Sequence, residues 1–363
     1  MTDPRSPGVD HRVWHPQRVR GALFAGAAVG LTVIVAALAV EIALRVFHLA
    51  PFAGVGTVSE SDFPMVPGIF GPGQEIVDRQ RPALPFGVRI NSLGYRGHDV
   101  SLQKAAGELR VLAIGDSFTY GDFVDDELTL PAQLEKQLSR RCNRPVTVIN
   151  AGVGGTTIDT HLEMMRRGWM ASPDIVLLTF SENDVTDLRD SAWVRLAANR
   201  RAKSRFPLSI AYPVLRHLAV WHFGLEVRAR IRARHAPPAP ASASPGEERS
   251  EIDALRTEYR RLLLELAAEV HGRQATLVLA AFPSHWTVKG VRSAEQLSWL
   301  EQTAAEAGIS TVSLLRPLQA SGQPVESLYL LPHDGHASPR GNEVAVGAVA
   351  ERFAALGLCG GQR

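Results

Sequence analysis

The sequence VLAIGDSFTYG, from Val111 to Gly121, decides how the rest of the chain is interpreted. It begins with four apolar residues, as a buried strand does, and these run directly into Gly115, Asp116 and Ser117. In a parallel α/β sheet, ligands bind in the crevice outside the carboxyl ends of the strands, and a glycine there lets the backbone turn sharply. The pattern therefore predicts a serine presented where nucleophiles lie, although Gly, Asp and Ser are also ordinary turn residues.

Three further stretches make a plain turn less plausible. Residues 146–150 form a second apolar run that leads into AGVGGTT, and residues 175–180 form a third that leads into SEND. Far downstream, HDGHASPRG places Asp334 and His336 two residues apart. In this order the four stretches resemble the SGNH (GDSL-type) hydrolase family, over roughly Asn91 to Leu358 with one insertion. The ordered combination is more specific than any single stretch.

Strands and helices alternate along this region, which indicates parallel βαβ units with helices on both faces of a sheet. We therefore expect an α/β chain with a flavodoxin-like three-layer α/β/α fold. Its five-stranded parallel sheet has the order 2-1-3-4-5, and one N-terminal transmembrane helix precedes it. The strands are expected at 111–114, 146–150, 175–180, 275–282 and 310–315, and the helices from Pro131, at 158–169, at 250–270, at 294–307 and after a Ser338 cap.

Residues 21–40 contain no charged side chain, and twenty residues are about the length that crosses a bilayer as a helix. Four arginines precede them, so the positive-inside rule predicts a cytoplasmic N-terminus and a catalytic domain in the periplasm or outside the cell. A cleaved signal peptide is the alternative, but its apolar core is usually shorter. Gly26 and Gly30 form a GxxxG face through which two such helices can pair.

The chain is expected to divide at changes in composition. The insertion at 187–249 has an Arg-rich first half with interspersed aromatic residues, which fits an amphipathic cap over the site, a helix on anionic lipid or an ordinary surface insertion. Its second half, HAPPAPASASPGEE, has the composition of a flexible linker. The predicted parts are a cytoplasmic tail at 1–20, a transmembrane anchor at 21–43, an extracytoplasmic linker at 44–88 and the hydrolase domain at 89–358.

The segment INSLGYRG, residues 90–97, precedes the serine strand. Segments of this type occur at the same place in many membrane-anchored members of the family. Its simplest interpretation is a glycine turn in which Arg96 makes a structural ion pair.

A serine hydroxyl needs a neighbouring base to become a nucleophile, and a carboxylate orients that base. The resemblance makes Ser117 the nucleophile, His336 the general base and Asp334 its orienting partner. Other members of the family space the last two residues one position further apart. His333, Asp334 and His336 also suggest a metal site, but no second cluster supplies further ligands, so no metal and no cofactor are expected.

Acyl transfer also needs hydrogen-bond donors for the oxyanion. By alignment with the family, these are the backbone N–H groups of Ser117 and Gly155 and the side chain of Asn183. Ser181 stands where the family commonly has glycine, and Glu182 lies beside the amide donor.

These residues predict a membrane-anchored serine esterase or acyl hydrolase of the cell envelope that works through an acyl-enzyme. Its substrate is an ester-bearing small molecule, lipid or polysaccharide, and the net charge of +2 without a nucleic-acid-binding motif argues against nucleic acid. The alternative is an O-acyltransferase, such as an O-acetyltransferase, that modifies an envelope polysaccharide. A binding module without turnover is a third hypothesis, against which the intact Ser117, His336 and Asn183 stand.

Cys142 follows the first helix of the domain, and Cys359 follows the last. In the expected strand order these two helices cover the same face of the sheet, and their carboxyl ends lie at the edge opposite the active site. A disulfide between them is therefore within reach in an oxidising compartment, and two unpaired thiols are the alternative.

Overall fold

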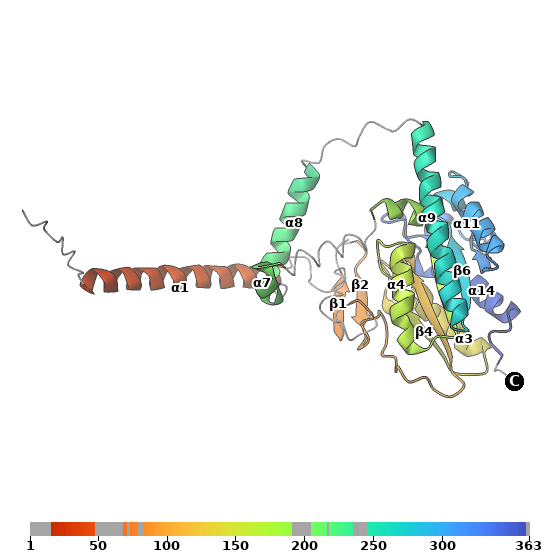
Figure 1. Cartoon of the computed structure of the whole chain (residues 1–363), viewed down its shortest axis with the longest axis horizontal. Coiled ribbons are helices and arrows are strands. Elements are labelled where there is room, and N and C mark those ends of the chain that lie inside the picture. The colour runs from red at the N-terminus through yellow and green to blue at the C-terminus, as the bar shows by residue number, and fades with distance from the viewer. Residues whose placement is uncertain are drawn as a thin grey trace, which may run out of the picture. The chain divides into compact units, whose positions relative to one another are not determined.

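The computed structural model describes residues 16–47, 68–70, 73–78, 83–190, 205–215, 218–234 and 245–360 (Figure 1). The strands are β1 (Gln74–Asp78), β2 (Phe86–Ile90), β3 (Leu109–Gly115), β4 (Val146–Asn150), β5 (Ile175–Ser181), β6 (Thr276–Phe282) and β7 (Ser310–Ser313). The helices are α1 (Pro16–Val46), α2 (Ser117–Tyr120), α3 (Leu130–Arg141), α4 (Ile158–Gly168), α5 (Asp184–Asp187), α7 (Leu208–Leu215), α8 (Ala219–Arg234), α9 (Pro245–Gly272), α10 (His285–Val288), α11 (Glu295–Glu306), α12 (Leu315–Ala320), α13 (Val325–Leu328) and α14 (Pro339–Ala355). Short 3-10 helices lie at Asp126–Leu128, Trp169–Ala171 and Leu188–Asp190. One compact unit holds α1 and α8, and another holds the sheets and the helices around them.

Five parallel strands form the central sheet in the order β4-β3-β5-β6-β7. Numbered along the domain, this is the predicted order 2-1-3-4-5, so the fold class is confirmed. The strands of a parallel sheet covered on both faces are continuous apolar runs, and every residue of β3 and β5 is buried. Each predicted strand begins or ends within two residues of the observed one.

Alternate residues of β3 supply two separate cores. Leu112 and Ile114 belong to the core under α4, α9 and α11, where α4 and α9 run side by side over the sheet (Figure 1). Val111 and Ala113 belong to the core under α3, α12 and α14. The helices therefore cover both faces, and the carboxyl ends of the strands stay open for a site.

The last helix begins as the sequence predicts. Ser338 caps α14 by accepting a hydrogen bond from the N–H of Gly341 at 3.1 Å, and Pro339 is its first residue. Ser338 also donates to the carbonyl of Ser327. These bonds fix the start of α14, directly after the segment that carries Asp334 and His336.

Two stretches differ from the sequence prediction. An antiparallel hairpin of β1 and β2 lies in the region 44–88 that was expected to be a linker, and isolated bridges through Arg96 connect it to the edge strand β4. Helix α9 begins at Pro245, so its first turn includes the end of the expected linker. The rest of that linker, residues 235–244, lies outside the described residues, as do the first fifteen residues of the tail predicted at 1–20 and the stretch 48–67.

The anchor region forms one long helix. Within α1, residues Phe24–Val46 are long and apolar enough to cross a membrane, and this helix is the one such segment in the described part of the chain. The helix begins before the predicted span of 21–43 and continues beyond it. An N-terminal apolar helix of this kind fits a membrane anchor or a signal sequence.

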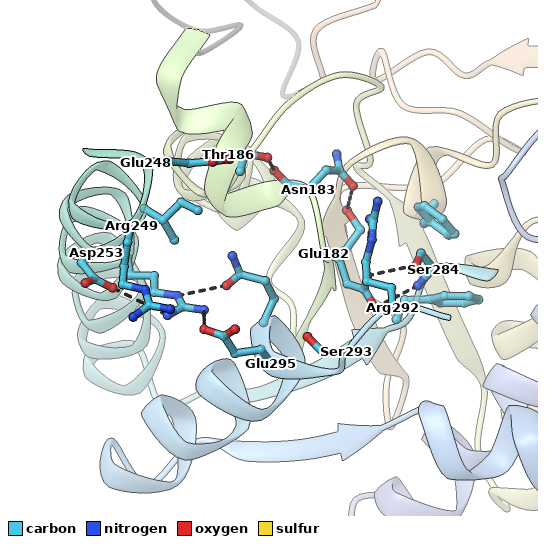
Figure 2. A pocket seen from close by; sticks show the side chains of 16 residues that line it. Glu182, Asn183, Thr186, Glu248, Arg249, Asp253, Ser284, Arg292, Ser293 and Glu295 are labelled. Carbon is cyan, nitrogen blue, oxygen red and sulfur yellow. Dashed lines mark hydrogen bonds and ion pairs between the residues drawn. The ribbon is translucent and has the colours of Figure 1, made fainter. Parts of the chain in front are cut away.

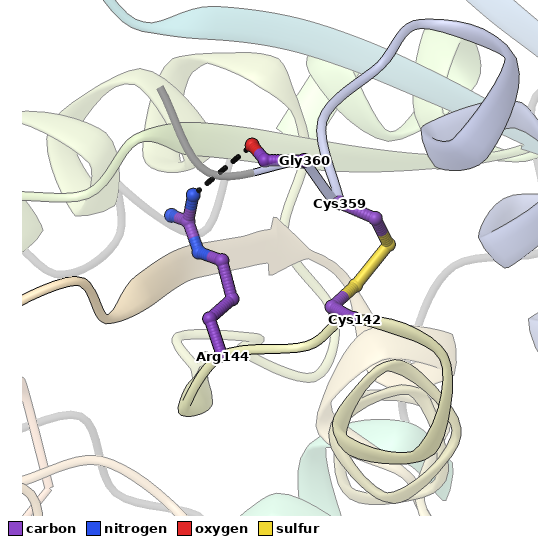
Figure 3. Close-up of a disulfide and its surroundings, with 4 residues drawn as sticks. All are labelled: Cys142, Arg144, Cys359 and Gly360. Carbon is purple, nitrogen blue, oxygen red and sulfur yellow. Dashed lines mark hydrogen bonds between the residues drawn. A yellow bond between two sulfur atoms is a disulfide. The ribbon is translucent and has the colours of Figure 1, made fainter. Parts of the chain in front are cut away.

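A disulfide joins Cys142 to Cys359, with Cα atoms 4.7 Å apart (Figure 3). Cys142 ends α3 and Cys359 follows α14, so the bond ties together the two helices that share one face of the sheet. Beside it, Arg144 donates to the carbonyl of Gly360 at 3.4 Å (Figure 3).

Candidate active site

Ser117 lies at the carboxyl end of β3 and is the first residue of the short helix α2. The turn needs Gly115, because a Cβ there would fall 2.2 Å from Oγ1 of Thr119 and 2.9 Å from the carbonyl oxygen of Thr179. Asp116 caps α2 by accepting from the N–H of Phe118 at 2.9 Å. The apolar strand and these two turn residues thus present the serine at the open end of the sheet.

His336 reaches Ser117 from the segment between α13 and α14. Its Nε2 lies 2.7 Å from Oγ of Ser117, and its Nδ1 makes a short hydrogen bond with Oδ1 of Asp334. The same carboxylate oxygen accepts from the backbone N–H of His336 at 2.9 Å. With one residue between Asp334 and His336, the carboxylate thus reaches one nitrogen of the imidazole while Ser117 lies at the other. Asp334 is buried, whereas the His336 side chain keeps about a quarter of its surface exposed.

Two phenylalanines flank the imidazole. The rings of Phe118 and Phe123 lie 5.1 and 5.6 Å from that of His336. Burial lowers the pKa of His336, but its hydrogen bond to Asp334 and the negative charges of Asp122, Asp334 and Asp116 outweigh burial and hold this pKa above its usual value. The ring therefore readily accepts a proton from the serine hydroxyl.

The predicted oxyanion donors occupy loops after neighbouring strands. Gly155, between β4 and α4, is exposed and has a φ of 68°, a conformation that favours glycine. Asn183 follows β5 and is held on both sides: its Oδ1 accepts from Oγ of Ser181 at 2.8 Å, and its Nδ2 donates to Asp187 at 2.6 Å. One N–H of the amide is therefore used by Asp187, and the amide carries a second.

Ser181, to which the sequence assigned no role, is the centre of a buried polar cluster. Three oxygens surround its hydroxyl: Oδ2 of Asp116 at 2.7 Å, Oδ1 of Asn183 at 2.8 Å and Oδ1 of Asp184 at 2.9 Å. The hydroxyl has one proton to donate, and the amide oxygen of Asn183 and an ionised carboxylate can only accept, so a protonated Asp184 can instead donate to Oγ of Ser181. Burial raises the pKa of both Asp116 and Asp184, most for Asp184, where the charge of Asp116 adds to the effect. Both the geometry and the direction of the shift favour the protonated form of Asp184.

Arg96 braces the turn that follows the serine helix. Its side chain is completely buried and lies over the ring of Tyr120, with the guanidinium carbon 4.8 Å from the ring centroid. Its donors contact Oδ1 of Asp126 and the carbonyl oxygens of Gly87, Tyr120, Gly121 and Val124. The structural ion pair expected for this residue is therefore present, with Asp126 at 2.7 Å. The four carbonyl bonds could not be foreseen, because they join segments far apart in the sequence.

A cavity of about 580 Å³ adjoins Asn183 (Figure 2). Phe118 and Asn183 form its wall beside Ser117, and the beginnings of α9 and α11 form the opposite wall. Thirteen of its sixteen lining residues have polar or charged side chains. Two of the contacts among them are the ion pair of Arg256 with Glu295 at 2.8 Å and the hydrogen bond that Oγ of Ser284 donates to Glu182 at 3.0 Å (Figure 2).

The described residues contain no group of three or more His, Cys, Asp or Glu side chains placed to hold a metal ion. His333, the third member of the suspected metal cluster, donates its backbone N–H to the carbonyl of Leu330.

Comparison with known proteins identifies the family. The model of the GDSL-like lipase/acylhydrolase family matches residues 113–344, which is more than half of the chain. A search of curated proteins found no match. Similar solved structures include a lipase/acylhydrolase from Enterococcus faecalis, at 14% identity and a TM-score of 0.40 over 68% of this chain and 96% of the other. An acetylxylan esterase mutant from Geobacillus stearothermophilus matches at 14% identity and a TM-score of 0.40 over 70% and 96% of the two chains. By the family match, the chain belongs to the GDSL-like lipase/acylhydrolase family and is a hydrolase of ester bonds.

Proposed function

We propose that this chain is a membrane-anchored serine esterase of the cell envelope, in which Ser117 is the nucleophile, His336 the general base and Asp334 its orienting carboxylate. One observation carries the proposal. Nε2 of His336 lies 2.7 Å from the serine oxygen while its other nitrogen bonds to Asp334, which is the geometry that proton transfer from a serine requires.

In the proposed reaction, Oγ of Ser117 attacks the ester carbonyl and His336 takes the hydroxyl proton. The bond to Asp334 keeps a proton on Nδ1, so that Nε2 is free to accept. His336 then gives its proton to the departing alcohol, and an acyl-enzyme remains. Water, deprotonated by the same imidazole, attacks this ester, and the acid leaves as Ser117 regains its proton.

The tetrahedral intermediates carry a negative oxygen that needs donors. We assign these to the backbone N–H groups of Ser117 and Gly155 and to the side-chain amide of Asn183. Because Ser181 and Asp187 hold this amide on both sides, its orientation is set before the substrate binds.

We further propose that α1 is an uncleaved anchor with a cytoplasmic N-terminus, and that residues 89–358 form the hydrolase domain on the other side of the membrane. The uncharged run at 21–40 and the four arginines before it support this orientation. Pairing of two anchors through Gly26 and Gly30 is a further prediction, which cross-linking in membranes can test.

The test is a panel of p-nitrophenyl esters of graded chain length, with an acetylated polysaccharide alongside. Ser117→Ala should abolish hydrolysis and leave the melting temperature nearly unchanged, since the hydroxyl acts covalently. Ser293→Ala, which changes a serine of the adjoining cavity, is the matched control and should keep activity. Most of the activity surviving in Ser117→Ala would contradict the assignment. Acetyl transfer to sugar without appreciable hydrolysis would instead favour the O-acyltransferase.

A further inference from the structure

Helix α8, from the first half of the insertion, begins on the anchor helix. The carboxylate of Glu41 accepts from the backbone N–H of Ala219 at 2.7 Å and from that of Val220 at 2.9 Å. The first N–H groups of a helix have no partner within it, so Glu41 supplies what the first turn of α8 lacks. The same carboxylate pairs with Arg45, and its side chain is only 13% exposed. The start of α8 is thereby fixed to one point on α1.

Glu41 is also the position at which the uncharged, apolar part of α1 ends. Glu41 directly follows the uncharged run at 21–40, whose described side chains are exposed, as expected for a helix surrounded by lipid. If α1 spans a bilayer, Glu41 lies at its surface. Figure 1 shows α8 leaving this end of α1 at a steep angle. A helix that begins at the surface and turns away from the spanning direction runs along the membrane.

The exposed side chains of α8 are consistent with a helix that lies along the membrane surface. Val220, Phe223, Val227 and Ile231 are spaced by three or four residues, which places them on one face of the helix, and all are exposed, from 36% for Val227 to 52% for Ile231. Leu225, which is 44% exposed, is the one large apolar residue of α8 exposed on the other side among the described side chains. Arg228 is exposed, and three more arginines follow in the sequence of α8. Exposed apolar side chains next to arginines can be accommodated together in the interface of an anionic bilayer, where the first meet acyl chains and the second meet headgroups.

We propose that α8 lies on the surface of the bilayer into which α1 inserts, with this apolar stripe among the acyl chains and its arginines against anionic headgroups. The proposal rests on the membrane anchoring proposed above and adds a second attachment to it. The contact between Glu41 and the first turn of α8 selects the bilayer as the occupant of the stripe, because it places the helix at the end of the membrane-spanning segment. A cap over the active site would not require this bond to the anchor.

Fluorescence quenching in the full chain tests the inference. Both native cysteines are in the disulfide, so a nitrobenzoxadiazole maleimide labels a single added cysteine. Val227→Cys places the probe on the stripe, and Leu225→Cys, two residues earlier, places it on the opposite side of the same helix. Each labelled protein is reconstituted in vesicles of phosphatidylcholine and phosphatidylglycerol that contain brominated lipids.

We expect the probe at 227 to be quenched several-fold more than the probe at 225, and less when phosphatidylglycerol is left out. Glu41→Ala should reduce the quenching at 227 while the protein still floats with the vesicles. Equal quenching at the two positions overturns the inference, and so does cross-linking of Val227→Cys to a second copy in place of quenching.

Two further measurements separate this result from the proposed function. Protein that does not float with vesicles refutes the anchor and the surface helix together. Protein that floats and hydrolyses esters, but shows no preferential quenching at 227, refutes only the surface helix.

Discussion

Replacing Arg96 with lysine should destabilise the domain and lower its turnover, although the charge is kept. All five N–H donors of the guanidinium are used, one on Asp126 and four on backbone carbonyls. An ammonium group has three donors, so at least two of these acceptors lose their partner. A buried polar group left unpaired costs about 1–3 kcal/mol, which gives a loss of roughly 2–6 kcal/mol. For a domain of this size we expect the melting temperature to fall by at least about 4 °C.

Turnover should fall because of where these carbonyls lie. Tyr120 ends the serine helix, and Gly121 and Val124 bracket Phe123, whose ring packs against His336. Without Arg96 this turn loosens, so the serine and the imidazole are aligned less often. We expect kcat for p-nitrophenyl acetate to fall about tenfold or more with a smaller change in KM.

Arg89→Lys is the matched control. Arg89 lies seven residues before Arg96, on β2, but its ion pair with Glu75 is more than half exposed on both sides, and such pairs contribute little to stability. Both variants should be assayed well below their melting temperatures. An Arg96→Lys protein that melts within about 1 °C of the unmodified chain would refute the stability argument. One that melts lower but keeps its kcat would refute the alignment argument.

Three further predictions follow from the site and the disulfide. The logarithm of kcat/KM should fall as pH is lowered through the raised pKa of His336, with a midpoint above about 6.5, and Asp334→Asn should move this limb to lower pH while lowering kcat; an unmodified midpoint at or below 6.5 contradicts the stated cause. Folding raises the pKa of Asp184, so the contribution of this carboxyl to the free energy of unfolding is fully present below the unfolded pKa of about 3.9. Between that pH and the raised folded pKa, the free energy of unfolding falls by about 1.4 kcal/mol per pH unit. Asp184→Asn, which does not titrate, should therefore gain melting temperature relative to the unmodified protein as the pH rises above about 4, and a decline over this rise would contradict the raised pKa of Asp184. Replacing Cys142 and Cys359 with serine opens a loop of 217 residues, for which chain entropy predicts up to about 5 kcal/mol of lost stability; about two free thiols per unmodified chain in denaturant would rule out the bond.

The sheet was predictable from the sequence chiefly because its two central strands, β3 and β5, are mainly apolar. The strand that leads to Ser117 and the one that ends at Ser181 are buried on both faces, so their sequences admit few alternatives. The pairing of Asp334 with His336 could also be predicted, because two residues separated by one position stay close together whatever the fold.

Contacts between distant segments could not be predicted. Arg96 gains its role from carbonyls of the serine turn, and nothing in INSLGYRG specifies where those carbonyls lie. Ser181 was visible only as a departure from the family pattern, because its three oxygen partners meet it only in the folded protein. The bond from Glu41 to the start of α8 joins residues 178 positions apart, and helical periodicity carries no information about it.

The covalent bond between α3 and α14 also has a consequence for the order in which the protein is completed. Cys142 is synthesised before β4, and its partner follows 217 residues later, after β7 and α14. During synthesis the first thiol therefore has no native partner while four of the five strands of the central sheet are still to follow. A native bond can close only when the last helix has docked on the face that α3 already covers. Formation of this native pair thus marks a completed domain, and in chains that stall earlier the thiol of Cys142 lacks its native partner and is open to exchange with other disulfides.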